Sequence, residues 1–139
     1  MIDKVAHIGI AVSDLEAALG LYQRILGLEP AEIEQVASQA VRVAVLPVGD
    51  SHIELLQSTT PEGPIARFIE KRGEGIHHLC FEVQDVAQAL ERLQEAGVQI
   101  IDRTPRIGAG GRRVAFLHPR STNGVLIELS ERPAEETAP

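Results

Sequence analysis

Short apolar runs alternate with polar, glycine-containing segments along most of the chain, and this pattern predicts strands and helices in a repeated order. Residues 4–12 and 76–83 have the length and apolar content of strands. Each run is followed by an aspartate at a helix N-cap position and then by helical periodicity, which predicts helices over 14–26 and 85–96. The apolar stripe expected on the first of these helices consists of Leu15, Leu19, Tyr22 and Leu26.

The remaining periodic segments complete two similar series. A short helix is predicted to start at Pro64, since proline suits a first helical turn. Glycine-rich turns at 49–50 and 108–111 indicate hairpins between apolar runs. The further strands predicted are 28–36, 39–47, 52–57, 98–104, 112–117 and 125–130.

The two series share their beginnings and their ends. Each first strand contains a histidine, His7 or His78, and each last strand contains a glutamate, Glu54 or Glu128, between two apolar residues. We therefore predict an α+β fold of two paired βαβββ modules that form a curved sheet around a metal cleft. The expected divisions are a first module, a linker helix, a second module and a disordered tail, at 1–60, 61–74, 75–131 and 132–139.

Composition narrows the classes of function. The 139 residues are 44% hydrophobic but only 3% aromatic, so the core is expected to be aliphatic. The sequence contains no run of about 18 apolar residues, so no membrane-spanning helix is predicted. Residues 1–5 lack the apolar segment of a secretory signal. A net charge of −7 argues against nucleic-acid binding. The single cysteine, Cys80, excludes an internal disulfide and favours the reducing cytoplasm.

Four polar side chains on the apolar strands are candidate metal ligands. Strand alternation places His7 opposite Ile8, and Glu54 opposite Ile53 and Leu55. The same alternation applies to His78 and Glu128 in the second module. A single strand histidine is usually an ordinary core or surface residue, but the recurrence of both residue types at matching places favours a divalent-cation site. The predicted ligands are His7, Glu54, His78 and Glu128.

The chemistry of this set limits the metal. Imidazoles and carboxylates without a thiolate favour Co²⁺, Mn²⁺, Ni²⁺, iron or Zn²⁺, with water filling an open six-coordinate shell. His52 and His118 have no counterpart in the other module and are left outside the predicted set, and His77 is expected to face away. Cys80 is interpreted as a small core residue.

A basic segment lies in the second module. Between Arg103 and Ile127 there are five arginines and no acidic residue. Such a local positive field suits a phosphate-bearing ligand, and a solvated basic surface explains it equally well. The glycines at 108–111 do not form a dinucleotide-binding fingerprint, because a strand rather than a helix follows them.

Several stretches resemble the methylmalonyl-CoA epimerases of the vicinal oxygen chelate superfamily, which also contains glyoxalase I and extradiol dioxygenases. The resemblance extends from about residue 5 to residue 129. The stretches that carry it are Gly73-Glu74-Gly75-Ile76-His77-His78, Arg106-Ile107-Gly108-Ala109-Gly110-Gly111, Phe116-Leu117-His118-Pro119, Gly124-Val125-Leu126-Ile127-Glu128-Leu129 and the linker helix from Pro64 to Ile69.

The resemblance implies a metal-dependent epimerase that interconverts (2R)- and (2S)-methylmalonyl-CoA by proton abstraction at C2 through a metal-stabilised enolate. It implies a divalent ion such as Co²⁺, a CoA thioester substrate, a homodimer, and Glu128 as both ligand and base. The family ligands carry over to His7, Glu54 (often Gln in relatives), His78 and Glu128. Val43 stands where some relatives have a glutamate proposed as an acid/base group, so the second such group is unassigned.

Alternatives within the same scaffold stay open at this point. A glyoxalase-type lyase or an extradiol dioxygenase would use a similar metal centre. A second glutamate in the ligand set and the scarcity of aromatic residues count against the dioxygenase. A non-catalytic small-molecule binding module would need no metal-ligand quartet.

Overall fold

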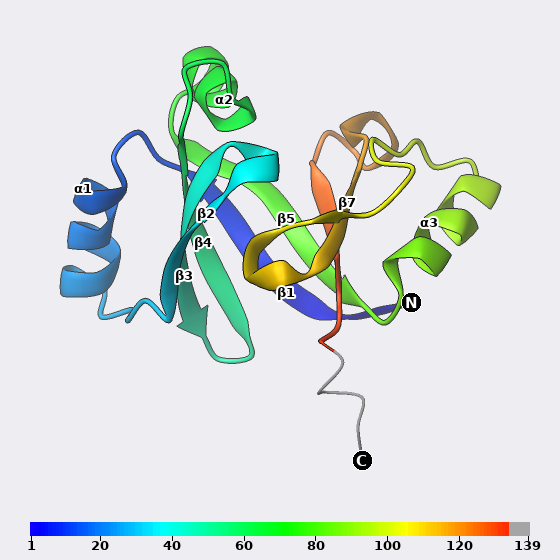
Figure 1. Ribbon diagram of the computed structural model, residues 1–139, viewed down its shortest axis with the longest axis horizontal. Coiled ribbons are helices and arrows are strands. Elements are labelled where there is room, and N and C mark those ends of the chain that lie inside the picture. The colour runs from blue at the N-terminus through cyan, green and yellow to red at the C-terminus, as the bar shows by residue number, and fades with distance from the viewer. Residues whose placement is uncertain (134–139) are drawn as a thin grey trace. The chain divides into compact units, whose positions relative to one another are not determined.

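Each of the two βαβββ patterns forms strands that hydrogen-bond into a sheet, with a helix on one face (Figure 1). The computed structural model describes residues 1–133. The predicted α+β class and the repeat are confirmed. Most of the predicted tail, from residue 134 onward, lies outside the described residues.

The first module has the strand order β2-β3-β4-β1. β1 and β4 are parallel, and the other neighbouring strands of this module are antiparallel. Its elements are β1 (Ile2–Ala11), α1 (Leu15–Leu19), the π-helix η1 (Gly20–Ile25), β2 (Glu32–Val36), the 3-10 helix η2 (Ala37–Gln39), β3 (Val41–Val48) and β4 (Ser51–Ser58), followed by α2 (Pro64–Arg72).

The second module repeats this arrangement with the order β5-β8-β7-β6. β5 and β8 are parallel, as β1 and β4 are, and the remaining neighbours are antiparallel. Its elements are β5 (Gly75–Val83), α3 (Val86–Glu95), β6 (Arg106–Ile107), the 3-10 helix η3 (Ala109–Gly111), β7 (Arg113–Leu117), the 3-10 helix η4 (Pro119–Ser121) and β8 (Ile127–Glu131).

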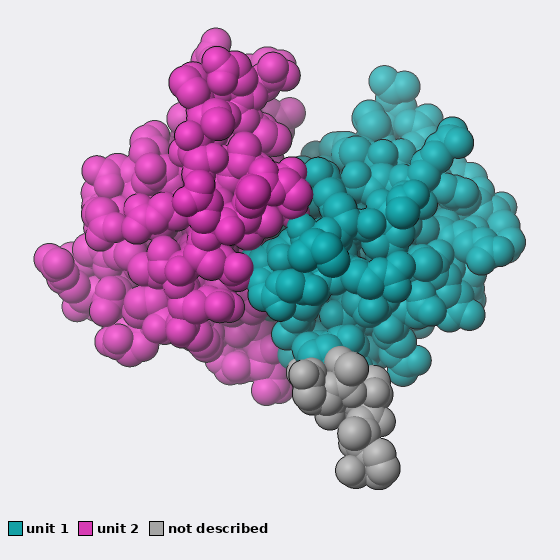
Figure 2. Space-filling model, in the orientation of Figure 1, with its two compact units in different colours: residues 1–6, 78–139 teal, residues 7–77 magenta. Residues whose placement is uncertain are grey.

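The described chain divides into two compact units that do not coincide with the predicted modules. Residues 7–77 form unit 2, and residues 1–6 together with the chain from residue 78 onward form unit 1 (Figure 2). β1 therefore begins in unit 1 and continues into unit 2. The predicted divisions at residues 60, 74 and 131 stay predictions.

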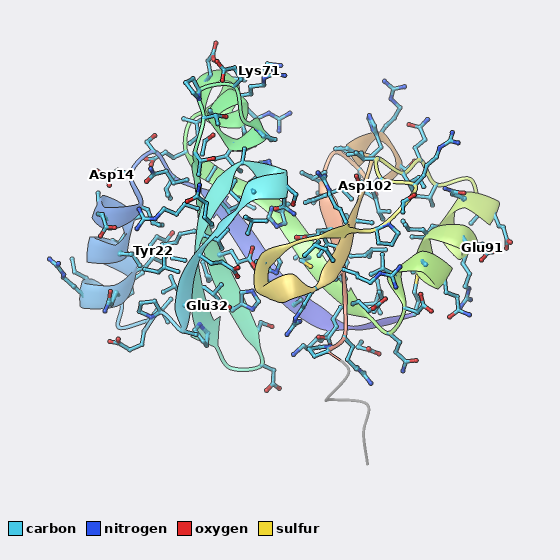
Figure 3. All side chains as sticks on the ribbon, in the orientation of Figure 1. Asp14, Tyr22, Glu32, Lys71, Glu91 and Asp102 are labelled. Atoms are coloured by element: carbon cyan, nitrogen blue, oxygen red, sulfur yellow. The ribbon has the colours of Figure 1, made fainter. Side chains whose placement is uncertain are left out.

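Each unit has its own aliphatic core between a helix and one face of the sheet. In unit 2, Leu15 and Leu19 of α1 pack with strand residues that include Leu46 and Leu55. In unit 1, Val86 and Leu90 of α3 pack with Leu129 and neighbouring strand residues. The charged side of α3 carries Glu91, which points away from the strands (Figure 3). Both helices begin at the predicted aspartate caps.

The predicted helix over 14–26 changes its winding after Leu19. The segment 20–25 is a π-helix, in which the Leu26 N–H donates to the Leu21 carbonyl at 2.9 Å. The wider turn moves Leu26 off the apolar stripe, and this residue is 58% exposed, so its predicted burial is wrong. Leu28, beyond the Gly27 turn, packs against the core in its place.

The predicted strand over 98–104 is also wrong. Ile100 makes one isolated bridge to Leu117, and regular pairing resumes only at the two residues of β6. The Asp102 carboxylate (Figure 3) accepts a hydrogen bond from the Phe116 N–H at 2.8 Å. The Asp102 side chain thus accepts from the Phe116 N–H, which in a regular sheet would donate to a backbone carbonyl of the neighbouring strand. Pro105 has no N–H to donate to a neighbouring strand. Within residues 1–133, no helix is both long and apolar enough to cross a bilayer.

Candidate metal centre

The face of the unit 2 sheet opposite α1 carries the first pair of predicted ligands. Ile53 and Leu55 of β4 pack on the helix side, so Glu54 between them projects to the other face. The parallel register pairs Gly9 with Glu54 and His7 with His52.

His7 and Glu54 are in direct contact. The Nε2 atom of His7 lies 3.2 Å from Oε1 of Glu54, and the two residues are only 5% and 6% exposed. An ionised carboxylate can only accept, so the imidazole nitrogen is the donor of this bond when no cation is bound. A buried carboxylate without such a partner would strongly destabilise the fold. The contact with His7 therefore offsets the cost of burying Glu54 on this face.

Unit 1 contains the equivalent pair. The Nε2 atom of His78 lies 2.9 Å from Oε1 of Glu128, and both side chains are almost fully buried. Leu79, Ile127 and Leu129 pack on the α3 side, which places His78 and Glu128 on the opposite face. The Phe116 ring meets His78 edge to face, with centroids 5.7 Å apart, and restricts the rotation of the imidazole.

Both pairs have donor atoms and spacings that fit a divalent cation. Two ligands bound side by side at about 2.1 Å from one cation lie about 3 Å apart, which is the separation found within each pair. Imidazole nitrogen and carboxylate oxygen suit Co²⁺, Mn²⁺, Ni²⁺ and Zn²⁺. The structure thus brings His7 to Glu54 in one unit and His78 to Glu128 in the other.

His52 is a candidate that the sequence analysis left out. Its Nε2 lies 3.0 Å from Oε2 of Glu54, and His7, His52 and Glu54 form one cluster of ligand-type atoms within 4.8 Å. The signal that could have found it is local, since residues 52 and 54 are two apart on one strand and share a face. His52 was excluded from the predicted ligands because the second module has no histidine at the equivalent position.

Glu82 is a second buried carboxylate that sequence reasoning did not single out. It is 2% exposed and lies on the same face of β5 as His78, four residues along. Arg112 Nη1 approaches its Oε1 at 3.5 Å, and Arg132 Nε approaches its Oε2 at 3.9 Å. These contacts compensate the buried charge.

The basic segment is less positive than its sequence suggests. Arg106 pairs with Asp102 at 3.4 Å, Arg112 with Glu82, and Arg113 with Glu131 at 3.6 Å. Three of the five arginines therefore contact carboxylates from outside the segment, which reduces the local field available to a phosphate. Arg103 and Arg120 are exposed. Cys80 is fully buried, as expected of a small core residue.

Comparison with known proteins assigns the chain to a family. A profile of the glyoxalase/bleomycin resistance protein/dioxygenase superfamily matches residues 6–116. The chain belongs to this superfamily. The predicted resemblance to the vicinal oxygen chelate proteins, another name for the same superfamily, is thereby confirmed.

Within the superfamily, the chain is similar to several epimerases. It is 42% identical over 133 residues to the ethylmalonyl-CoA/methylmalonyl-CoA epimerase of Cereibacter sphaeroides, covering 94% of this chain and 99% of that protein. The crystal structure of methylmalonyl-CoA epimerase from Mycobacterium tuberculosis superposes with a TM-score of 0.91 at 36% identity, over 99% and 93% of the two chains. A methylmalonyl-CoA epimerase in complex with methylmalonyl-CoA and NH₄⁺ gives the same TM-score at 34% identity, over 96% and 97%.

Proposed function

We propose that this protein is a metal-dependent methylmalonyl-CoA epimerase. The observation that carries the proposal is the buried His–Glu pair that recurs in both units of a chain whose 42% identical relative is named an ethylmalonyl-CoA/methylmalonyl-CoA epimerase. The reaction inverts the configuration at C2, the carbon between the thioester and the carboxylate. It proceeds by removal of the C2 proton from one side and its return from the other.

In this proposal His7, Glu54, His78 and Glu128 together hold one divalent cation. When bound, the cation supplies a Lewis acid that stabilises the negative charge developing on the thioester oxygen as the proton leaves. The buried position of all four side chains limits competition from water for these donors. These imidazole nitrogens and carboxylate oxygens would hold an ion that could also bind substrate oxygens.

Glu128 is proposed to move the proton on one side of C2. It is the predicted ligand that the resemblance also assigns as a base, and its buried carboxylate contacts His78 through Oε1. Val43, at 1% exposure, supplies no titratable atom at the place where some relatives have glutamate. The group that serves the other side of C2 is therefore a different one, and we do not assign it.

Hydrogen exchange at C2 tests the reaction directly. Proton NMR follows the C2 proton signal of methylmalonyl-CoA in deuterated water, first with metal-stripped protein and then after Co²⁺ is added. A sample with Co²⁺ and no protein is the control. We expect the C2 proton signal to disappear faster only with protein and metal together. The absence of protein-dependent exchange in both states would contradict the proposal and direct the search to other substrates of the scaffold.

Three finer features belong to the same proposal. We propose Co²⁺ as the metal, with Mn²⁺, Ni²⁺ and Zn²⁺ as replacements to compare by activity per bound ion. A homodimer is proposed from the resemblance, and sedimentation equilibrium measures it. The cytoplasm is proposed as the location because the chain has only one cysteine, which is buried.

A further inference from the structure

Glu54 differs from Glu128 in the number of histidines that contact it. His7 Nε2 lies 3.2 Å from Oε1 of Glu54, and His52 Nε2 lies 3.0 Å from Oε2 of the same side chain. Each carboxylate oxygen of Glu54 thus has its own imidazole partner. In unit 1 the residue equivalent to His52 is Leu126, whose side chain has no hydrogen-bond donor.

His52 is held against both members of the unit 2 pair. It is the register partner of His7 across the parallel β1 and β4 strands, and the two rings stack with centroids 4.8 Å apart and planes inclined by 29°. Its side chain is 23% exposed, compared with 8% for that of Glu54. The ring therefore lies at the margin of the buried pair, with its Nε2 directed inward to the glutamate.

The two hydrogen bonds to Glu54 respond differently to a cation. A histidine binds a metal through a nitrogen lone pair, so His7 can no longer donate from Nε2 to Glu54 once that nitrogen is a ligand. His52 contacts the other oxygen, Oε2, and its bond is compatible with a cation on Oε1. Such a bond behind a ligand fixes the orientation of the carboxylate and typically affects metal affinity.

We infer that His52 is a positioning residue of the metal centre, which holds Oε2 of Glu54 so that Oε1 stays directed to the side of His7. The inference rests on the metal centre of the proposed function and adds a fifth residue to it. His52 acts through Glu54 and is not itself a ligand. The alternative geometry, in which His52 Nε2 binds the cation directly, requires it to leave the Glu54 carboxylate.

The test compares Co²⁺ dissociation constants, measured by competition with a chelator, in four forms of the full chain. His52→Leu places the unit 1 residue type at this position, and His52→Gln keeps an N–H donor in a side chain of similar length. His77→Leu is the matched control, because His77 contacts Phe68 with ring centroids 5.0 Å apart and belongs to no cluster of ligand-type atoms found within residues 1–133. The visible absorption spectrum of bound Co²⁺ reports the ligand set independently of activity.

We expect His52→Leu to weaken Co²⁺ binding by roughly 10- to 100-fold, the usual effect of losing a partner of a metal ligand. His52→Gln is expected to recover most of this loss, and His77→Leu to bind like the wild type. The Co²⁺ spectrum of His52→Leu should keep the wild-type band positions, because the ligands are the same. If His52→Leu does not fold, His52→Ala makes the same comparison.

Two results would overturn the inference. Unchanged Co²⁺ affinity in His52→Leu would show that the contact does not position Glu54, and shifted absorption bands would show that His52 is a ligand. Measurements on the wild type distinguish a failure of this inference from a failure of the proposed function. Co²⁺ binding without C2 exchange would reject the epimerase and leave the role of His52 standing, whereas no Co²⁺ binding by the wild type would reject both.

Discussion

At the scale of single residues, Glu128 has the most demanding combination of roles. This residue is 4% exposed and its carboxylate contacts His78 Nε2 at 2.9 Å. The carboxylate is proposed both to bind the cation and to move a proton. Glu54 is equally buried and contacts His7 in the same way, with His52 as a second partner, but it is proposed for only the first of these roles. The two glutamates therefore offer a matched comparison of binding with proton transfer.

We predict that Glu128→Gln lowers the rate of C2 exchange by on the order of 10²- to 10⁴-fold, the usual contribution of a general base. Glu54→Gln should keep most of the activity, because an amide oxygen still binds the cation and relatives often have glutamine there. In both variants the amide oxygen can accept from the histidine of the pair, His78 or His7, so the fold is expected to persist. In Glu54→Gln the amide NH2 then faces His52, whose Nε2 can accept in the other tautomer. Equal losses of exchange in the two variants, measured by proton NMR at saturating Co²⁺, would contradict the assignment.

At the scale of elements, the two modules use the same device to begin their helices. The Asp14 side chain accepts from the Ala17 N–H at 3.1 Å, and the Asp85 side chain accepts from the Gln88 N–H at 3.0 Å. Both caps were predicted from the sequence, because a cap depends on residues close together in the chain. The π-helical turn after α1 was not predicted, since it breaks the 3.6-residue period on which the prediction relied.

Removing one cap should destabilise the protein by a small and measurable amount. We expect Asp85→Ala to lower the free energy of unfolding by about 1 kcal/mol, and Asp85→Asn to lower it by much less, because asparagine caps as well as aspartate. Urea unfolding followed by circular dichroism measures both. An equal loss in the two variants would show that the charge of Asp85, rather than its acceptor oxygen, stabilises α3.

At the scale of the whole molecule, the proposal requires ligands from both units to act on one cation. Each unit contains one His–Glu pair of matching chemistry. A pair alone offers two protein ligands, whereas stable sites for these metals normally use at least three. His52 is a third ligand-type group beside the unit 2 pair, but it is proposed to position Glu54 and not to bind the cation. The proposed centre is thus a property of the complete chain and not of either module.

We predict one bound Co²⁺ per chain, measured by equilibrium dialysis with elemental analysis. His7→Ala and His78→Ala should each weaken binding by more than the ~10- to 100-fold typical of residues behind a ligand. Their effects should be similar, because each removes one ligand of the same ion. Two ions per chain, or normal binding after loss of His78, would indicate separate sites in the two units.

The sequence by itself determined the features that depend on local periodicity. Alternation along the strands predicted which face His7, Glu54, His78 and Glu128 occupy, and each pair is found in contact on the face opposite its helix. The recurrence of the βαβββ pattern predicted two similar modules, and the structure contains both. The face of each residue and the order of elements along the chain follow from the geometry of neighbouring residues. They can therefore be predicted without knowing which distant segments are in contact.

Only the tertiary structure decided which side chains meet across distant parts of the chain. It placed His7 against Glu54 and stacked its ring on that of His52, and both contacts depend on the parallel register of β1 and β4. It also replaced the strand predicted over 98–104 by a side-chain bond from Asp102 to the backbone of Phe116. Pairings over long separations are set by competition among many packings of the whole chain, and local periodicity does not contain that information.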